Sequence, residues 1–247
     1  MARHFLELDG AATLETEHYI LARRAVRDAL ELCAMAVVHG SAGLGKTYAV
    51  DELLDELTVP VLWVSFPSRP TPRLVAATLL EQIDGRATRL DRFSIIARLV
   101  ELLGEQTRLV VIDESQLLTP DCIELLRYLH DHQRTRFALV LVGGNGTWAV
   151  LSREPMLTSR VYRRVSFKAL PRTDVIAAIP EYHPLYTGVD AGLLGLIDDL
   201  FAHGNLRNWA AFTHSAQRLA EETGREGLDE QIARNVFALH GGGGSNR

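Results

Sequence analysis

The 247-residue sequence has few cysteines and no long apolar run, and each shortage excludes a class of protein. Its two cysteines, Cys33 and Cys122, lie in apolar helical patterns without metal-ligand spacing, so we expect buried free thiols. No apolar run approaches the roughly 20 residues that cross a bilayer. The first residues include acidic side chains, unlike a signal peptide. We therefore expect a cytoplasmic protein with no membrane partner.

Lysine is also scarce, and positive charge is unevenly distributed. Only Lys46 and Lys168 stand against 24 arginines, and the net charge of −5 does not by itself indicate nucleic-acid binding. Basic residues outnumber acidic ones by six to one over 153–172 and by six to three over 69–98, whereas ten acidic residues face three basic ones over 174–230. This asymmetry fits a basic face on an acidic body, and solvated helix faces explain it equally well.

Residues 40–47 fit the pattern G-x-x-x-x-G-K-[ST] of a phosphate-binding loop. The apolar run 35–39 before them predicts a buried strand, and 48–54 predicts a helix, which is the context that separates a true loop from a chance match. Glycines let backbone N–H groups face phosphate oxygens, and the helix N-terminus adds positive potential. We predict that ATP is bound by Gly40, Ser41, Ala42, Gly43, Leu44, Gly45, Lys46, Thr47 and Tyr48.

The last two positions of this loop carry specific chemistry. A lysine in a chain that uses arginine nearly everywhere else suggests that this position requires a compact point charge. We expect Lys46 to reach the β- and γ-phosphates and the Thr47 hydroxyl to bind Mg²⁺. The alternative is a glycine-rich turn that ends in an ordinary lysine.

A second motif supplies the acidic groups that such a loop requires. The apolar run 109–112 predicts a strand that ends in Asp113, followed by Glu114. At the carboxyl edge of a parallel sheet, Asp113 is placed to hold Mg²⁺ and Glu114 to orient or deprotonate the attacking water. Alternatively, both acids cap the next helix. By analogy of fold, the strand predicted at 59–66 between the two motifs, together with the second acid, favours the AAA+ ATPases over nucleotide kinases and GTPases.

Strands alternating with helices predict an α/β fold. We expect the three-layer sandwich of a P-loop NTPase of the AAA+ type, with a central parallel five-stranded sheet and a small C-terminal helical subdomain. The strands are predicted at 35–39, 59–66, 109–113, 137–142 and 164–167, and after Pro171 only helices, at 172–179, 191–203, 206–223 and 228–239. The expected parts are an arm (1–13), a nucleotide-binding domain (14–170), a helical lid (171–240) and a flexible tail (241–247).

Two further polar residues occupy positions that resemble AAA+ sensors. Asn145 follows the strand 137–142, where these proteins place a residue that helps to position the water, with Thr147 as the alternate and a plain turn as the other interpretation. The segment 204–207 has the pattern G-N-x-R, in which the arginine covers the nucleotide. A cation in the first helical turn opposes the helix dipole by about 0.3–1 kcal/mol, which favours a functional reason for Arg207.

Arginines between the fourth and fifth strands suggest a site completed by a neighbouring subunit. AAA+ proteins commonly present an arginine there to the γ-phosphate of the adjacent subunit, so that the site is complete only in the oligomer. Arg160 is our first candidate and Arg163 the second. For either residue, a surface or DNA-facing role is about equally plausible.

Longer segments resemble one group of AAA+ proteins. Residues 38–47, 111–118, 123–131 and 139–143 resemble the transposition regulators, namely the phage Mu B protein and its relatives TnsC and TniB. The similarity spans about residues 14–215, and only the phosphate loop and the Asp-Glu motif are highly specific. It implies an ATP-dependent DNA-binding ATPase that forms rings or helical filaments on duplex DNA, selects the insertion target and activates a transposase.

The resemblance has limits, because the residues before Leu14 are too few for the helix-turn-helix region of the Mu B protein. We then expect the ATPase domain itself to contact DNA, through arginines that neutralise phosphates without reading bases. The candidates are Arg69, Arg73, Arg86, Arg89 and Arg92.

Three other functions stay open. A helicase loader of the DnaC/IstB kind would share the ATP site and a DNA partner. A secretion or signalling ATPase like the ExeA group would share the ATP site only. A small-molecule or nucleotide kinase fits least, because of the Asp-Glu pair and the helical C-terminal part.

Overall fold

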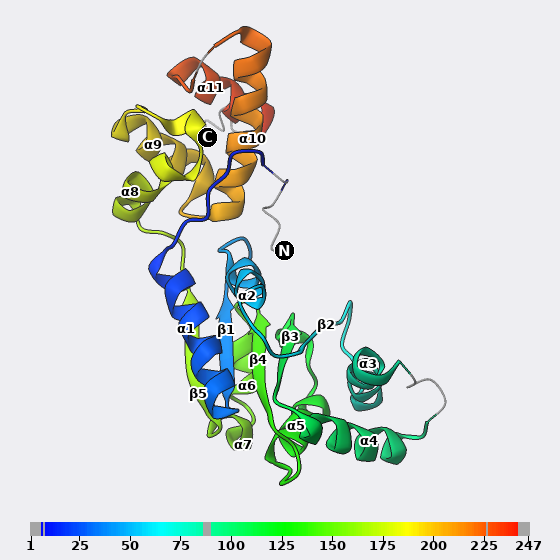
Figure 1. Cartoon of the computed structure of the whole chain (residues 1–247). Helices are drawn as coiled ribbons and strands as arrows, with labels where there is room; N and C mark the ends of the chain where they lie inside the picture. Colours follow the sequence, from blue (N-terminus) through cyan, green and yellow to red (C-terminus); the bar gives the residue numbers. More distant parts are fainter. Residues whose placement is uncertain (1–5, 7, 86–89, 226, 242–247) are drawn as a thin grey trace.

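The computed structural model describes residues 6, 8–85, 90–225 and 227–241. It has a lower α/β body and an upper helical body (Figure 1). The strands are β1 (Met35–Gly40), β2 (Val61–Ser65), β3 (Arg108–Asp113), β4 (Phe137–Gly143) and β5 (Val161–Phe167). The α-helices are α1 (Glu17–Leu32), α2 (Lys46–Leu54), α3 (Pro72–Asp84), α4 (Arg92–Glu105), α5 (Pro120–Asp131), α6 (Thr147–Leu151), α7 (Pro155–Thr158), α8 (Arg172–Tyr182), α9 (Ala191–Ile197), α10 (Leu206–Thr223) and α11 (Glu230–Leu239).

The five strands form one parallel sheet in the order β2-β3-β4-β1-β5. The prediction of a three-layer α/β fold with a five-stranded parallel sheet is therefore confirmed. β1, which leads into the phosphate loop, and β3, which ends in Asp113, are not neighbours. The strand between them in space is β4, whereas β2, which lies between the two motifs in the sequence, is at the edge of the sheet.

Alternation along the strands explains how the sheet is covered on both faces. In β1, Met35 and Val37 face the core that contains α3, α4 and α5, whereas Ala36 and Val38 face the core that contains α1 and α2. Every residue of β1 and β4 is buried, as continuous apolar runs predict.

The edge strand β5 begins earlier than its apolar residues predict. It starts at Val161 rather than at 164, and its first residues include the exposed Tyr162, Arg163 and Arg164. An edge strand pairs on one side only, so its outer residues do not need to be apolar, and a search for apolar runs misses them.

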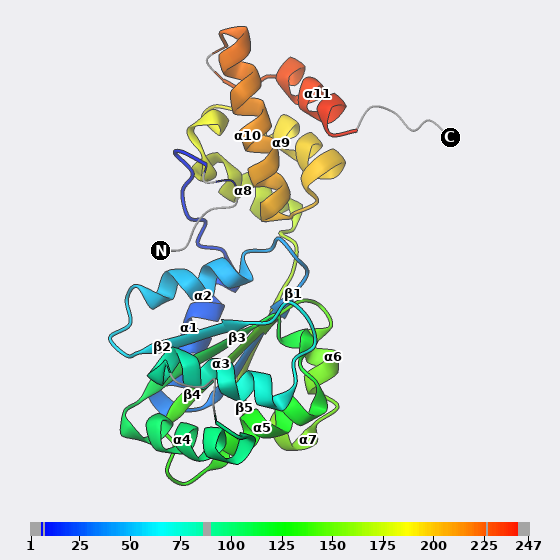
Figure 2. The ribbon, with the colours of Figure 1, turned by 90° about the vertical axis from the view of Figure 1, so that its right-hand side faces the viewer.

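The described residues after β5 form helices and turns only, and α8–α11 are here called the helical subdomain. Its core is aromatic, with Trp209, Tyr186 and Phe212 fully buried. Two views at right angles show these helices stacked beyond the carboxyl ends of the strands (Figures 1 and 2). A π-turn at Asp198–Ala202 follows α9, where the sequence predicted one helix to 203.

The segment before α1 crosses between the two bodies. Leu8 is buried in the core of the helical subdomain, and Ala12 N–H donates to Tyr182 O at 2.7 Å. One residue later, Thr13 Oγ1 lies 2.6 Å from Tyr48 Oη in α2. Residues 8–14 therefore link the helical subdomain to the α/β body.

No helix among the described residues combines the length and the apolar character needed to cross a bilayer.

Candidate functional site

The phosphate loop follows a path that only glycine tolerates. Gly40, Gly43 and Gly45 have φ values of 147°, 80° and 89°, in the region that other residues avoid. A Cβ on Gly40 would overlap Phe167 O at the end of β5. A Cβ on Gly43 would overlap the Asn205 side chain of the helical subdomain. The loop is therefore packed closely between the sheet and this subdomain.

Lys46 and Thr47, in the first turn of α2, face the end of β3. Lys46 is 8% exposed, and its Nζ donates to Ser41 O at 2.6 Å. Burial lowers the pKa of Lys46, the carboxylates of Asp113 and Glu114 oppose this shift, and Arg207 adds to it. Thr47 Oγ1 donates to Asp113 Oδ2 at 3.3 Å, across 66 residues of sequence.

The oxygens at the end of β3 and the start of α2 suit a magnesium ion. Burial raises the pKa of Asp113, while the Glu114 N–H, which donates to Asp113 Oδ1 at 2.8 Å, and the Thr47 hydroxyl oppose the shift. Carboxylate and hydroxyl oxygens are the hard ligands that Mg²⁺ takes, and the ion usually keeps several waters. The donor set present therefore fits Mg²⁺, which Thr47 and Asp113 would hold.

Glu114 follows directly, in a left-handed conformation with φ 52° and ψ 37°. Its side chain accepts a hydrogen bond from Gln116 Nε2. Gln116 Oε1 in turn accepts from Gly144 N at 2.8 Å and from Thr147 Oγ1 at 3.2 Å. Gln116 was not among the residues predicted from the sequence, and its place two residues after Asp-Glu is the only sequence signal for it.

The loop after β4 reaches the phosphate loop through Asn145. Asn145 Nδ2 donates to Ser41 Oγ at 2.8 Å. Thr147, the alternate candidate, is fully buried and is bonded to Gln116 instead. The structure thus brings Asn145, but not Thr147, to the phosphate loop.

The helical subdomain closes over the loop through the start of α10. Asn205 Nδ2 donates to Ala42 O at 2.8 Å, and Arg207 N donates to Gly43 O at 3.0 Å. Asn205 also caps α10, because its Oδ1 accepts from the N–H of Arg207 and of Asn208. The sequence pointed to Arg207 only, although the capping preference of asparagine also marks Asn205.

These elements enclose a cavity of about 500 Å³. This volume lies within the roughly 300–1,000 Å³ of small-ligand sites. Its lining includes residues 42–47 of the phosphate loop, together with Asp113, Glu114 and Arg207. Apolar and aromatic side chains, with Thr16 and Asp51 among them, also line it: Ala12, Leu14, Tyr19, Tyr48, Phe167, Tyr182, Leu206 and Ala210. Charged groups and apolar surface in one cavity suit a nucleotide, which carries both; Asn145 itself does not line the cavity.

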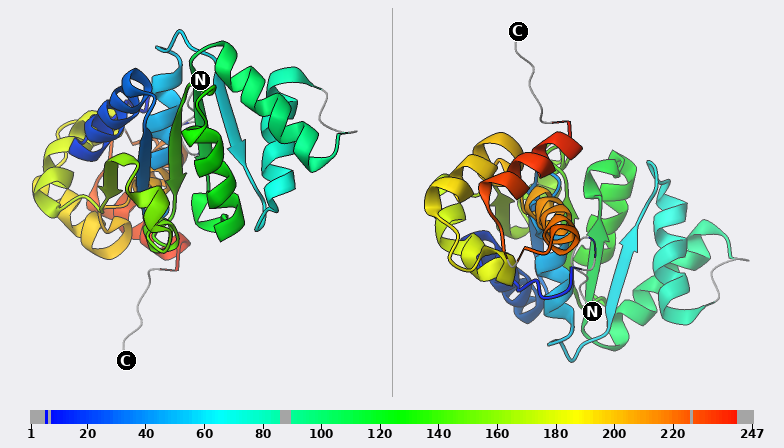
Figure 3. Two further views of the ribbon diagram at one scale, coloured as in Figure 1. Left: turned by 90° about the horizontal axis from the view of Figure 1, so that it is seen from below. Right: turned by 90° about the horizontal axis from the view of Figure 1, so that it is seen from above.

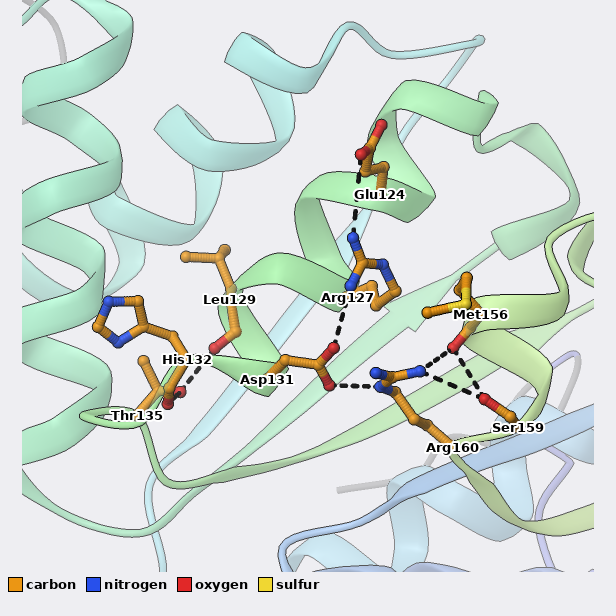
Figure 4. Close-up of polar contacts among 9 residues, drawn as sticks. All are labelled: Glu124, Arg127, Leu129, Asp131, His132, Thr135, Met156, Ser159 and Arg160. Carbon is orange, nitrogen blue, oxygen red and sulfur yellow. Dashed lines mark hydrogen bonds and ion pairs between the residues drawn. The ribbon is translucent and has the colours of Figure 1, made fainter.

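Arg160 lies just before β5, at the amino ends of the parallel strands, whereas the cavity lies at their carboxyl ends. Its Nε donates to Asp131 Oδ1 at 2.5 Å and its Nη1 to Met156 O, while Arg127 Nη1 donates to Asp131 Oδ2 at 3.1 Å (Figure 4). In the parallel pairing of β1 and β5, Val161 is opposite Met35 and Phe167 opposite Gly40. A seven-residue strand spans about 20 Å, so Arg160 does not reach the phosphate loop of its own chain.

Arg163, the second candidate, points toward α1. Its Nε donates to Asp28 Oδ2 at 2.9 Å, and its guanidinium carbon lies 4.4 Å from the centre of the Tyr162 ring. The structure brings neither arginine to the cavity.

The arginines expected to contact DNA lie around α3 and α4, which extend past β2 at the side of the sheet away from β5 (Figures 1 and 3). Arg69 precedes α3, Arg73 is in its first turn and Arg92 begins α4; all three are exposed. Arg86 and Arg89 lie outside the described residues.

Comparisons with known proteins bear on the family and the fold of the chain. Residues 29–151 match the family model of the AAA domain. No curated protein matches the sequence. Similar solved structures include Cdc6p from Pyrobaculum aerophilum, with 18% identity and a TM-score of 0.72 over 93% of this chain and 68% of that one.

Two more solved structures have the same fold. The Orc1 protein of Aeropyrum pernix, in complex with DNA, has 20% identity and a TM-score of 0.67 over 93% of this chain and 66% of that one. The RuvB Holliday junction branch migration motor of Thermotoga maritima has 16% identity and a TM-score of 0.63 over 92% and 70%. The chain therefore spans about two thirds of the length of these structures, and the likeness shows the fold.

Proposed function

We propose that this chain, which contains an AAA domain and has the P-loop AAA+ fold, is an ATPase that assembles on duplex DNA and regulates transposition. In this proposal it works in the cytoplasm, hydrolyses ATP to ADP and phosphate, forms a ring or helical filament, selects the target DNA and activates a transposase. The observation that carries the ATPase proposal is the cavity, in which the phosphate loop, the Asp113-Glu114 pair and Arg207 meet from three separate segments.

Each side chain of the cavity has a role in this proposal. Lys46 binds the β- and γ-phosphates, Thr47 and Asp113 hold Mg²⁺, and Glu114 orients or deprotonates water. Bound Mg²⁺ supplies positive charge against the phosphate oxygens. Asn145 donates to Ser41 Oγ and so holds the loop after β4 beside the phosphate loop.

Residues 171–240 act in this proposal as a lid that reports the nucleotide state. The backbone of the phosphate loop is bonded directly to α10 through Asn205 and Arg207. A change in the path of the loop at Ala42 or Gly43 is therefore transmitted to the first turn of α10, and the Arg207 side chain lies at the cavity wall.

The position of Arg160 supports a homo-oligomer. Since Arg160 lies about one strand length from its own phosphate loop, it acts on a nucleotide only if that nucleotide is held by another copy. In the single chain its guanidinium is bonded to Asp131 and Met156 O. Arg163 is the second candidate for this role.

Contact with DNA is proposed for Arg69, Arg73 and Arg92, together with Arg86 and Arg89. The three described residues are exposed, with Arg69 before α3, Arg73 in its first turn and Arg92 at the start of α4. Such contacts to phosphates give binding that depends strongly on salt and little on sequence. The proposal that the process is transposition rests on the resemblance of segments such as 38–47 and 111–118 to the transposition regulators.

Electron microscopy of negatively stained mixtures tests the proposal. With ATP and non-specific duplex DNA at low salt, we expect DNA coated by filaments or stacked rings, and none with Lys46→Ala. Lys168→Ala, which changes the only other lysine, is the matched control.

Other outcomes favour the other functions. Isolated closed rings, or binding to single strands only, contradict the transposition proposal and favour a helicase loader of the DnaC/IstB kind. No association with DNA contradicts both and leaves an ExeA-like ATPase.

A further inference from the structure

The carboxamide of Gln116 joins two loops of the site. Gln116 lies in the short 3₁₀ helix Ser115–Leu117 after β3, and its carboxamide contacts Glu114 just before this helix. It also contacts Gly144 in the loop after β4 and Thr147 at the start of α6. Both Glu114 and Gln116 line the cavity. Gln116 is thus the side chain that connects the proposed base to the loop bearing Asn145.

The orientation of this carboxamide is determined by its partners. A backbone N–H only donates, so the hydrogen bond from Gly144 N identifies the atom it meets as Oε1. The Thr147 hydroxyl donates to the same oxygen. Nε2 must then point the other way, toward the carboxylate of Glu114, where it donates.

Close packing surrounds the Oε1 end of Gln116, whose side chain is half-buried. Thr147 is fully buried, and a Cβ on Gly143 would overlap both Thr147 Oγ1 and Gln116 Oε1. Ser115 Oγ, also fully buried, donates to Val142 O at 2.7 Å. The turn after β3 and the loop after β4 are therefore held together as one unit.

Glu114, by contrast, is exposed, and Gln116 is the partner of its side chain. An exposed glutamate has several rotatable bonds, and ordering them costs entropy. A base acts only when its carboxylate is held within reach of the proton it takes. A fixed donor beside Glu114 supplies that restriction before any ligand arrives.

We propose that Gln116 is a positioning residue: its Nε2 holds the Glu114 carboxylate at the cavity, while its Oε1 sets this position relative to the loop after β4. This inference rests on the proposed role of Glu114 as the base. Asn145, the residue after Gly144, donates to Ser41 of the phosphate loop, so the arrangement extends from Glu114 to the phosphate loop.

Gln116→Glu removes the hydrogen bond that Nε2 donates to Glu114 without changing the size of the side chain. The variant keeps the shape and an acceptor for Gly144 N–H and Thr147, but it loses the Nε2 donor and places a second carboxylate against Glu114. We expect kcat to fall by about tenfold to a hundredfold, the order of loss that a misplaced group causes, while KM for ATP changes by less than about twofold. Gln217→Glu is the matched control, because Gln217 Nε2 also donates to a glutamate, Glu221, at 3.2 Å on α10.

The Tm of the ATP-free protein tests the same contact between Gln116 and Glu114. Gln116→Glu should lower Tm, and the exchanged pair Glu114→Gln/Gln116→Glu should recover it, because a glutamine at 114 can donate to a glutamate at 116. The exchanged pair should bind ATP and stay inactive, since the proposed base has been removed.

The outcomes distinguish this inference from the proposed function. Wild-type kcat in Gln116→Glu, or additive Tm changes in the exchanged pair, overturns the positioning role and leaves the ATPase assignment standing. If the wild-type protein does not hydrolyse ATP, or Glu114→Gln hydrolyses it at the wild-type rate, the assignment of Glu114 is wrong and the inference falls with it.

Discussion

The two edges of the same sheet hold their polar side chains differently. At the carboxyl edge, Lys46, Thr47, Asp113 and Glu114 line a cavity with room for a ligand. At the amino edge, Arg160 is bonded to Asp131 and to Met156 O in the preceding helix α7, within the chain (Figure 4). If both edges serve one reaction, as we propose, only a second copy of the chain brings them together. In this proposal the site is therefore complete only in the assembly.

The largest effect is expected at the carboxyl edge, from Lys46→Ala. Loss of the buried ammonium removes the point charge that we propose binds the phosphates, so ATP binding should become undetectable by calorimetry. Lys168→Ala, at an exposed position, should bind as the wild type does. Normal affinity in Lys46→Ala would show that the loop does not bind the triphosphate.

Glu114→Gln separates binding from turnover at the same edge. The variant should bind ATP normally, while kcat falls by about 10²-fold or more, the order that general-base catalysis contributes. ATP-bound assemblies on DNA should therefore persist, as measured by sedimentation with labelled DNA. Undiminished turnover would exclude Glu114 as the base.

Arg160→Ala tests whether the two edges meet in the assembly. It should leave ATP binding unchanged and lower the ATPase rate of assemblies by about 10³-fold, the order that an arginine finger contributes. Mixing Arg160→Ala with Lys46→Ala should restore part of the activity, because each variant supplies the edge that the other lacks. No recovery, with both variants present in one assembly, contradicts action between subunits and directs attention to Arg163.

Removing a carboxylate should lower stability at the amino edge, where Asp131 lies, and should not lower it at the carboxyl edge, where Asp113 lies. Asp131→Asn takes away the charge that two arginines share, so the free energy of unfolding should fall by about 1 kcal/mol. Asp113→Asn removes a charge that burial penalises, so its Tm without ligand should equal or exceed that of the wild type. Urea and thermal denaturation measure both, and a lower Tm for Asp113→Asn would mean that its bonds outweigh the cost of burial.

The smallest effect is expected away from both edges, at Arg73 on α3. Loss of one phosphate contact should weaken DNA binding equally for all sequences and reduce the slope of log K against log salt by about 1. Fluorescence anisotropy at several salt concentrations measures this slope. Arg218→Ala, on the exposed face of α10, is the control and should leave it unchanged.

The elements around the site follow from local patterns, whereas the contacts between them do not. Continuous apolar runs predict β1, β3 and β4, and the glycine spacing predicts the loop, since each is decided within a few residues. Gln116 and Asn205 were missed because each acts on a segment far away in the sequence, at Gly144 and Ala42. A local pattern does not reveal such partners.

The candidate residues differ in the same way. Glu114 and Asp113 could be predicted because a strand end places them at a known edge of a parallel sheet. The ion pair of Arg160 with Asp131 depends on how α5 and α7 pack, and no spacing in the sequence encodes it.

The segment before α1 has a practical consequence for handling the protein. Ala12 and Leu14 line the cavity, and Leu8 is anchored in the helical subdomain. An affinity tag or fluorophore attached ahead of Leu8 therefore sits a few residues from the cavity wall. No residue of α11 lines the cavity, so a label placed on an exposed residue of α11 leaves the cavity wall unchanged.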